Sequence, residues 1–167
     1  IYTAPNDAPK EINNDIDAAL SAEVVLLDFS KNPEYLQYDC YLIACFSDHP
    51  LITKLKFLLD PSCNILGIFQ ASIYVALATQ TNSKSIILTS GKEWEHLLDA
   101  AILKFFNTTS WPNSFEHTKA IGLNPLQLDD PSNYKTLHKM VNSLMVSGIS
   151  TIILGCAGLS SQLNNFK

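Results

Sequence analysis

The sequence predicts an α/β protein, either one domain or two small lobes, with mainly parallel strands and helices on both sheet faces. Short apolar runs alternate along the chain with segments of helical periodicity, which is typical of parallel βαβ units with right-handed crossovers. The apolar runs do not alternate with polar residues, which favours strands covered on both faces. With 167 residues, of which 47% are hydrophobic, the chain has enough apolar side chains for a packed core.

The first elements are a loop and a helix. Residues 3–9 hold two prolines with Asn and Asp, which is turn chemistry. Apolar residues then recur at helical spacing from about residue 12 to residue 29, which predicts a helix. The run Val24–Leu27 alone also fits a strand, so the assignment of this segment stays open. Residues 40–44 form an apolar run that predicts a buried strand.

Two further strands and two helices are expected in the middle of the chain. We expect Asp48 to cap a helix that starts near Pro50, because Asp is a preferred N-cap residue and Pro fits the first helical position. A strand is expected over 65–69 and a helix over 71–79. A third strand is expected at 85–88.

The second half repeats the alternation of strand and helix. Ser90-Gly91-Lys92-Glu93 fits a capping box, and the helix after it has an apolar stripe at 3.6-residue spacing: Trp94, Leu97, Leu98, Ala101, Ile102 and Phe105. A polar loop over 107–118 leads to a strand over 119–123.

The last helix and strand lead to a segment of small residues. Asp130-Pro131 is expected to cap a helix whose inward residues are Tyr134, Leu137, Val141 and Leu144. A strand over 151–154 then ends in Gly155-Cys156-Ala157-Gly158. We divide the chain into a first lobe, 1–65, a second lobe, 66–156, and the start of a return segment to the first lobe, 157–167. Ile1 is not Met, and residues 160–167 open a helix without completing it, so we expect a fragment of a longer chain.

Composition excludes several classes of partner. The longest apolar run, residues 40–46, has seven residues, far below the roughly 18 that a membrane-spanning helix needs. The net charge is −5, and none of the basic residues is Arg. Arg makes the usual bidentate contacts to phosphate and guanine, so we expect no nucleic-acid partner and no membrane partner.

The four cysteines are expected to be reduced thiols in a cytosolic protein, because the core needs no disulfides and no signal peptide precedes them. No C-x-x-C pair occurs, so a zinc site is not expected. Cys40 lies within a strand and Cys63 within a turn, and both are interpreted as structural. The histidines lack ligand spacing, and capping explains Asp130 of the pair Asp129–Asp130.

Cys45 and Cys156 are the candidate reactive residues. Each follows an expected strand and precedes a turn into a helix, and ligands in open α/β sheets bind beyond the carboxyl ends of strands. Backbone amides and a helix N-terminus would lower a thiol pKa from about 8.5 towards neutrality. Gly155 and Gly158 permit close backbone approach and an anion-binding nest. The alternative is that both cysteines are small buried hydrophobes at strand ends.

Two segments around these cysteines resemble a known family. Residues 44–51, Ala-Cys-Phe-Ser-Asp-His-Pro-Leu, and residues 153–158, Ile-Leu-Gly-Cys-Ala-Gly, are similar to the two cysteine motifs of the Asp/Glu/hydantoin racemase superfamily. The nearest branch is that of hydantoin and allantoin racemases. The resemblance extends over most of the chain and includes Gly67-Ile68 after the first motif.

The resemblance implies a two-lobed racemase fold with the active site in the cleft between the lobes, Cys45 in one lobe and Cys156 in the other. It implies cofactor-independent racemisation, in which one thiolate removes the Cα proton and the other thiol returns a proton to the opposite face. A proton that leaves one face and arrives on the other requires two acid/base groups in different protonation states. Homo-oligomers are expected for such enzymes.

Further substrate-binding residues follow from the same match. The amides of Phe46, Ser47, Ala157 and Gly158 are candidates for holding the substrate and stabilising a developing enolate. Asp48 and Gly155 belong to the two motifs. Thr89 and Ser90, at the end of a strand, are expected to line the same cleft, although capping alone would explain Ser90.

The sequence also departs from the family pattern. Members generally begin with a strand that ends in an Asn-Pro-Asn-type motif, and they carry C-terminal helices after the second motif; the sequence shows neither. His49 stands where Pro or Gly is common. It could tune Cys45, but we favour the interpretation of a partly exposed histidine at a helix start.

The expected substrate is a hydantoin or a related cyclic ureide such as allantoin, because a chain without Arg suits neutral amide rings. The alternatives are an Asp/Glu-type amino-acid racemase, a decarboxylase or isomerase that uses one cysteine, and a non-catalytic metabolite-binding relative. The loops over 3–9 and 107–118 are expected to set the size of the substrate pocket.

Overall fold

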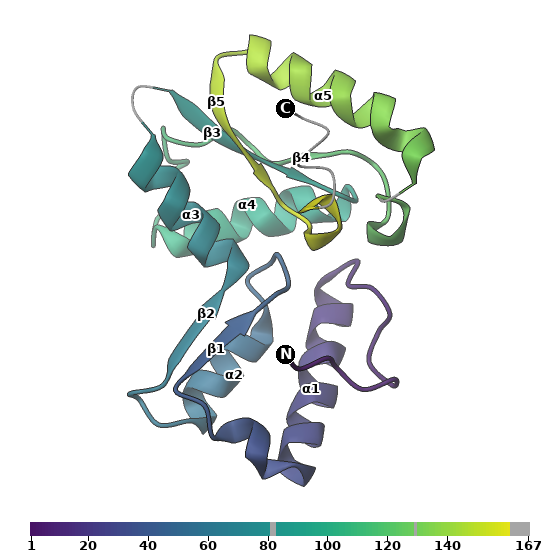
Figure 1. Ribbon diagram of the computed structural model, residues 1–167. Coiled ribbons are helices and arrows are strands. Elements are labelled where there is room, and N and C mark those ends of the chain that lie inside the picture. The colour runs from purple at the N-terminus through teal and green to yellow at the C-terminus, as the bar shows by residue number, and fades with distance from the viewer. Residues whose placement is uncertain (81–82, 129, 161–167) are drawn as a thin grey trace.

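The chain folds into two parallel sheets with helices packed around them (Figure 1). The computed structural model describes residues 1–80, 83–128 and 130–160. The first sheet pairs β1 (Cys40–Ile43) with β2 (Asn64–Gly67), and the second has the order β4-β3-β5, with β3 (Lys84–Thr89) central, β4 (Lys119–Ala120) and β5 (Ile149–Leu154). Every pairing between these strands is parallel, as the alternation of strands and helices predicts.

The described part of the chain has five α-helices and four short 3₁₀ turns. The α-helices are α1 (Asp15–Lys31), α2 (Pro50–Leu58), α3 (Ile68–Thr79), α4 (Glu93–Phe105) and α5 (Tyr134–Val146). Three of the 3₁₀ turns are η1 (Pro33–Leu36), η2 (Pro125–Gln127) and η3 (Pro131–Asn133), and the fourth covers residues 157–160. The run Val24–Leu27 lies within α1, which settles its open assignment as helix. None of the described helices is both long and apolar enough to cross a membrane.

Two strand boundaries differ from the expected ones. The strand expected over 65–69 ends at Gly67, and α3 begins directly at Ile68 rather than near residue 71. The apolar run continues through this boundary because α3 is itself apolar, so composition does not mark the change. The strand expected over 119–123 has only two residues, because Gly122 adopts a φ of 84° and turns the chain away from β3.

The second sheet is covered on both faces, as expected. Ile87 of β3 packs in a cluster with α3 and α4, whereas its neighbour Leu88 packs in a separate cluster with α5. Both side chains are fully buried. Neighbouring residues of a strand point to opposite faces, so β3 reads as a continuous apolar run.

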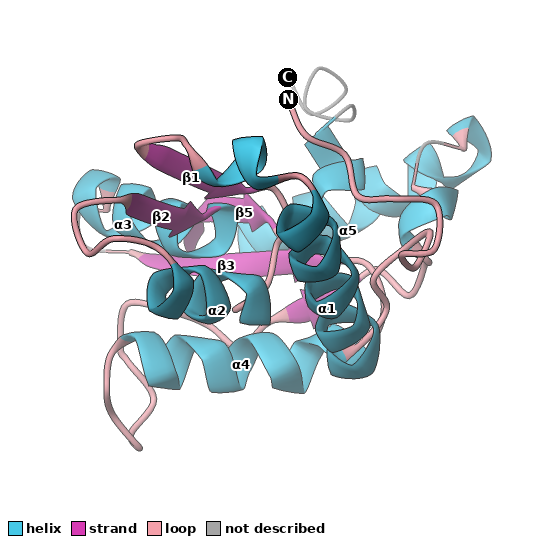
Figure 2. Cartoon of the chain, turned by 90° about the horizontal axis from the view of Figure 1, so that it is seen from below, coloured by secondary structure: helices cyan, strands magenta, loops and turns pink. Residues whose placement is uncertain are grey.

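The first sheet is covered differently. Figure 2 shows α1 and α2 on one side of β1 and β2, and Tyr41, Ile43 and Ile65 pack with these helices. On the opposite face, Leu42 is 61% and Leu66 39% exposed. The expected burial of residues 40–44 is therefore wrong, because the strand is only partly covered in the described part of the chain.

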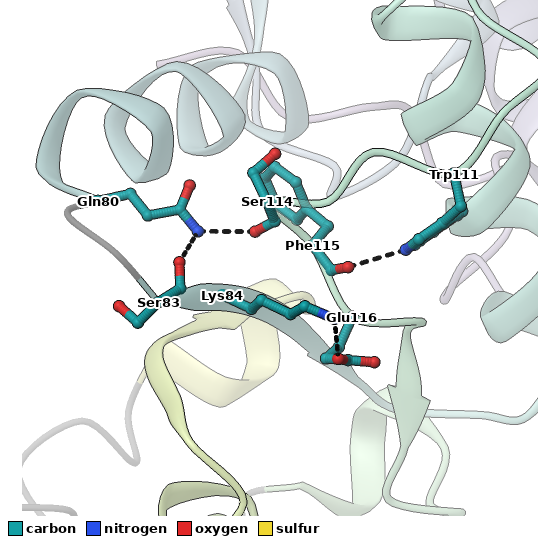
Figure 3. A network of polar contacts seen from close by, with 7 residues as sticks. All are labelled: Gln80, Ser83, Lys84, Trp111, Ser114, Phe115 and Glu116. Carbon is teal, nitrogen blue, oxygen red and sulfur yellow. Dashed lines mark hydrogen bonds and ion pairs between the residues drawn. The ribbon is translucent and has the colours of Figure 1, made fainter.

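The loop over 107–118 is anchored at the amino end of β3 (Figure 3). Phe115 is fully buried and forms a parallel bridge with Ser85. The Gln80 amide donates to the Ser114 carbonyl at 2.7 Å, and Trp111 Nε1 donates to the Phe115 carbonyl at 2.8 Å. The middle of this loop is therefore held at the amino end of β3, opposite to the end at which Thr89 lies.

The two sheets correspond to two lobes, which Figure 1 shows one above the other. We retain the division of the chain at about residue 65 as a proposal. The whole of β2 is best assigned to the first lobe, because Gly67 pairs with Ile43.

Candidate active site

Cys45 lies just beyond the carboxyl end of β1 and is half-buried. Its Sγ shares a hydrogen bond with Ser47 Oγ at 3.6 Å. Burial raises the pKa of the Cys45 thiol, the Ser47 hydrogen bond lowers it in part, and the charge of Cys156 raises it further. The expectation that nearby amides and a helix N-terminus lower the pKa of Cys45 is therefore wrong, because desolvation of the thiolate is the larger effect.

Cys156 lies beyond the carboxyl end of β5, in a loop that is fastened to β3. The Gly155 amide donates to the Leu88 carbonyl at 2.8 Å, and Thr89 Oγ1 donates to the Gly155 carbonyl at 3.1 Å. A 3₁₀ turn over residues 157–160 follows, in which the Leu159 amide donates to the Cys156 carbonyl. The backbone on both sides of Cys156 is thus fixed by hydrogen bonds.

The two cysteine loops pack against each other across the lobes (Figure 1). A Cβ built on Gly155 would lie 3.3 Å from the Phe46 ring, so the residue before Cys156 adjoins the residue after Cys45. The two thiols are also close enough that the charge of one raises the pKa of the other. The structure therefore brings the two candidate cysteines together, one from each lobe.

The other predicted residues of the cleft mostly hold this arrangement in place. Phe46 is buried and makes a T-shaped contact with Phe69, with ring centroids 5.7 Å apart. The Ser47 amide donates to the Cys45 carbonyl at 3.0 Å, so it is engaged within the loop. Thr89 and Ser90 are each only 1% exposed, and the hydroxyl of Thr89 supports Gly155. That Thr89 and Ser90 line the same cleft as the cysteines stays a prediction.

The predicted capping box at Ser90 does not form. Helix α4 begins at Glu93, with Lys92 in the N-cap position and no side-chain hydrogen bond at the cap. The Ser90 carbonyl instead accepts from the Gly122 amide at 2.8 Å. Ser90 therefore belongs to the junction between β3 and the turn at Gly122.

Asp48 and His49 have roles opposite to those expected. His49, not Asp48, occupies the N-cap of α2, and its Nδ1 accepts from the Leu51 amide at 3.3 Å. Asp48 accepts from Gln70 Nε2 at 3.0 Å and forms an ion pair with Lys104. Since His49 is 3% exposed, the expectation of a partly exposed side chain is wrong.

The burial of His49 makes stability depend on pH. Burial lowers the pKa of its imidazole, so the folded protein keeps the ring neutral where the unfolded chain, with a pKa near 6.5, takes up a proton. The unfolded state then binds more protons, and we expect the free energy of unfolding to fall as the pH falls from about 7 to 5.

Urea denaturation at several pH values measures this effect. The matched variant is His49→Asn, because Asn is a good N-cap residue that does not titrate. We expect this variant to lose less stability than the unsubstituted protein between pH 7 and 5. An equal loss in both proteins would contradict the assignment.

An open cavity of about 300 Å³ adjoins the cysteine loop of the first lobe. Its polar lining residues are Asp15, Ser47 and Asp48. Its apolar wall is formed by Ala18, Ala19, Pro50, Trp94, Leu97 and Leu98. Neither residues 3–9 nor 107–118 contribute to this described lining, and their expected role in setting the size of the substrate pocket stays a prediction.

Sequence reasoning missed the cavity residues on α1 and α4. Trp94, Leu97 and Leu98 belong to the apolar stripe of α4, which was interpreted as core. The alanine side chains of Ala18 and Ala19 give no indication in the sequence that they line a cavity. The only available signal is that the stripe begins in the first turn of α4, at the end of β3 where ligands bind in α/β folds.

His117, Cys40 and Cys63 are not part of the candidate site at Cys45 and Cys156. His117 Nδ1 pairs with Asp99 Oδ2 at 2.7 Å and its ring stacks on Trp111. Cys40 is exposed, and Cys63 Sγ donates to a backbone carbonyl. In the described part of the chain, no three His, Cys, Asp or Glu side chains are grouped so that they could hold a metal ion. Asp129 lies outside the described residues. So do residues 161–167, which make up all but the first residue of the helix expected over 160–167.

The fold and the site together define a class: two-lobed α/β proteins in which a cysteine follows a strand of each lobe and the two loops meet. This arrangement suits racemases, which need acid/base groups on both faces of one carbon. A family profile described as Asp/Glu/Hydantoin racemase matches residues 1–166, and the chain belongs to this family.

Individual relatives agree with this assignment. The chain is 34% identical over 165 residues to an uncharacterised protein of Schizosaccharomyces pombe, covering 95% of the chain and 64% of the relative. It is 28% identical over 168 residues to a hydantoin racemase of Rhizobium meliloti, covering 98% and 65%. The chain thus spans about two thirds of the length of these relatives.

Solved structures support the fold. An allantoin racemase from Klebsiella pneumoniae superposes with a TM-score of 0.79 at 20% identity, covering 97% of this chain and 63% of that one. An allantoin racemase from Pseudomonas fluorescens superposes with a TM-score of 0.76 at 17% identity, covering 99% and 67%. These matches confirm the α/β fold with parallel sheets that the sequence predicts.

Proposed function

We propose that this protein is a cofactor-independent racemase that inverts the Cα of a hydantoin or a related cyclic ureide, with Cys45 and Cys156 as its two acid/base groups. The observation that carries the proposal is the meeting of the two cysteine loops, each at the carboxyl end of a strand in a different lobe. Membership in the racemase family supports the reaction class. The hydantoin racemase relative supports the choice of substrate.

The chemistry of inversion suits two thiols. A thiolate on one face takes the Cα proton, and the electron pair of the C–H bond passes into the adjacent carbonyl as an enolate. The thiol on the other face then donates its proton to the carbon, which completes the inversion and leaves that sulfur as a thiolate. Each turnover therefore exchanges the protonation states of the two cysteines and consumes no co-reactant.

The environment of Cys45 suggests how the resting site is charged. Because burial raises its pKa, Cys45 holds its proton at neutral pH. We therefore propose that Cys45 is the proton donor for the enantiomer whose Cα hydrogen faces Cys156. The opposite enantiomer requires the opposite charge state, with Cys45 as the thiolate.

The enolate needs hydrogen-bond donors. Preorganised backbone amides stabilise such developing charge without reorganising during the reaction. We propose the amides of Phe46 and Ala157 for this role, since each directly follows one of the cysteines. The Ser47 amide, which donates within its own loop, is better suited to holding Cys45 in place.

Deuterium incorporation at Cα tests the proposed function. The protein is incubated in heavy water at neutral pH with single enantiomers of 5-benzylhydantoin, 5-methylhydantoin, allantoin and aspartate. We expect exchange at Cα and loss of optical rotation with a cyclic ureide, above the rate in buffer alone. No exchange with any cyclic ureide would contradict the proposal, and exchange with aspartate alone would assign the protein to amino-acid racemases.

A further inference from the structure

The loop that carries Cys45 starts in the first lobe, but its side chains are bound by the second. Phe46 packs in a cluster of buried residues that includes side chains of α3, β3 and α4, and its ring meets that of Phe69 on α3 edge-on. Figure 1 shows α3 and α4 beside the second sheet, whereas β1, which leads into the loop, belongs to the first. The place of Cys45 therefore depends on contacts that cross between the lobes.

Asp48 makes the polar part of these crossing contacts. Its Oδ1 accepts from Gln70 Nε2 of α3 at 3.0 Å, and its Oδ2 forms an ion pair with Lys104 of α4. Lys104 is mostly exposed, and exposed ion pairs add little stability. A hydrogen bond to a carboxylate is stronger than one between two neutral groups. Gln70, which is half-buried, is therefore the residue that fixes the Asp48 carboxylate.

The amide of Gln70 is itself held in one orientation. It lies over Gly67, the last residue of β2, where an added Cβ would collide with Gln70 Oε1. Turning the amide over would place Oε1 against the Asp48 carboxylate, so Nε2 faces Asp48. In the part of the chain that the structure describes, Oε1 is buried without a hydrogen-bond partner. An unpaired buried oxygen lowers stability, so stability alone does not explain a glutamine at this position.

We propose that Gln70 is a positioning residue for Cys45, because by binding Asp48 it holds the first thiol at the distance from the second that inversion requires. The inference rests on the proposed racemase function and deepens it. The turn between Cys45 and Asp48 is short, and within it the Ser47 amide donates to the Cys45 carbonyl at 3.0 Å. A shift of Asp48 therefore moves the thiol, and a misplacement of about 1 Å lowers a rate by roughly 10²-fold.

The substitution Gln70→Met tests the inference. Methionine is close to glutamine in length and shape, but it has no donor for Asp48. It also removes the unpaired oxygen, and Asp48 keeps Lys104 as a partner, so we expect the midpoint of urea denaturation to change little. The matched control is Gln37→Met, the same change at an exposed position outside the cysteine loops. Asp48→Ala removes the acceptor and leaves Gln70 in place, so it decides the outcome if Gln70→Met does not fold.

Alkylation of the two thiols reports on the loop without any substrate. Iodoacetamide is added at neutral pH, and tandem mass spectrometry of the digested protein follows each cysteine separately. Cys45 is half-buried, so it reacts faster when its loop opens. Loss of a hydrogen bond to a charged group shifts such a local opening by roughly 10-fold. We expect Gln70→Met and Asp48→Ala to accelerate alkylation of Cys45 by this factor and to leave that of Cys156 nearly unchanged.

Inversion is then compared with isotope exchange in heavy water, with single enantiomers of 5-benzylhydantoin and of allantoin as probes. If Cys45 is misplaced, Cys156 still removes its proton and returns a deuteron to the same face. We expect Gln70→Met to lower kcat for inversion by roughly 10-fold or more, to change KM little, and to raise the ratio of exchange to inversion for the enantiomer whose Cα hydrogen faces Cys156. Gln37→Met is expected to resemble the unsubstituted protein.

The outcomes separate the positioning role from the reaction. If no cyclic ureide is racemised but alkylation of Cys45 alone is accelerated, Gln70 does hold the loop and the racemase proposal fails. If Cys45 reacts no faster in the folded variant, or if both thiols accelerate equally, the positioning role is overturned whatever the activity. A full rate of inversion in Gln70→Met also overturns it, and so does an equal fall of exchange and inversion, which indicates a general loss of structure.

Discussion

Replacing Cys45 or Cys156 with Ser is expected to abolish inversion while leaving isotope exchange on one face of the carbon. A serine hydroxyl yields its proton far less readily than a thiol, so each variant loses one of the two acid/base groups. Loss of such a group lowers the rate by roughly 10²–10⁴-fold. The remaining cysteine still removes a proton from its own face and returns a deuteron to the same face.

The two variants should therefore be complementary. In heavy water, Cys45→Ser is expected to exchange the Cα proton of one enantiomer and Cys156→Ser that of the other, each without inversion. Cys40→Ser is the matched control, because Cys40 is exposed on the strand that leads to Cys45. A full rate of inversion in either site variant, or the same enantiomer exchanged by both, would disprove the two-base scheme.

Gly155→Ala is expected to reduce both stability and activity. A Cβ at this position would collide with the Ile87 side chain and lie 3.2 Å from the Leu88 carbonyl and 3.3 Å from the Phe46 ring. The carbonyl belongs to the central strand and cannot move easily. Overpacking of this kind costs about 1–3 kcal/mol, and the displaced loop carries Cys156.

Urea denaturation and the racemisation assay measure the two effects. Gly91→Ala is the control, since the Cβ there would meet only the carboxylate of Glu93, the far end of a flexible side chain. We expect the control to change stability by less than about 0.5 kcal/mol. If Gly155→Ala keeps both its stability and its rate, the close packing of the two loops is not required for function.

Elements with strong periodicity were predictable from the sequence. The apolar stripe of α4 and the apolar run of β3 both formed where expected. Spacing of 3.6 residues suits a helix with one buried face, and an unbroken apolar run suits a strand that is buried on both faces. The meeting of Cys45 and Cys156 was predicted from their places after strands and from the family resemblance. What no pattern could show was that desolvation at Cys45 outweighs the amides around it.

Local signals failed where tertiary contacts decided the outcome. Ser90 looked like a capping residue, but its backbone is required at the turn after β3. Asp48 looked like another, but Gln70 and Lys104 bind its carboxylate and leave the cap to His49. Sequence patterns identify which groups can form a hydrogen bond, whereas the fold determines which partner is in reach.

The pairing of β3 with β5 has a consequence for the order in which the molecule assembles. Leu88 and Leu154 pair across 66 positions of the chain, and this ladder places the loop that contains Cys156. Contacts so distant along the sequence form late, because a long loop must close before they are gained. The loop that contains Cys45 depends on the much more local pairing of β1 with β2. A nascent chain would therefore hold one half of its proposed reaction centre well before the other exists.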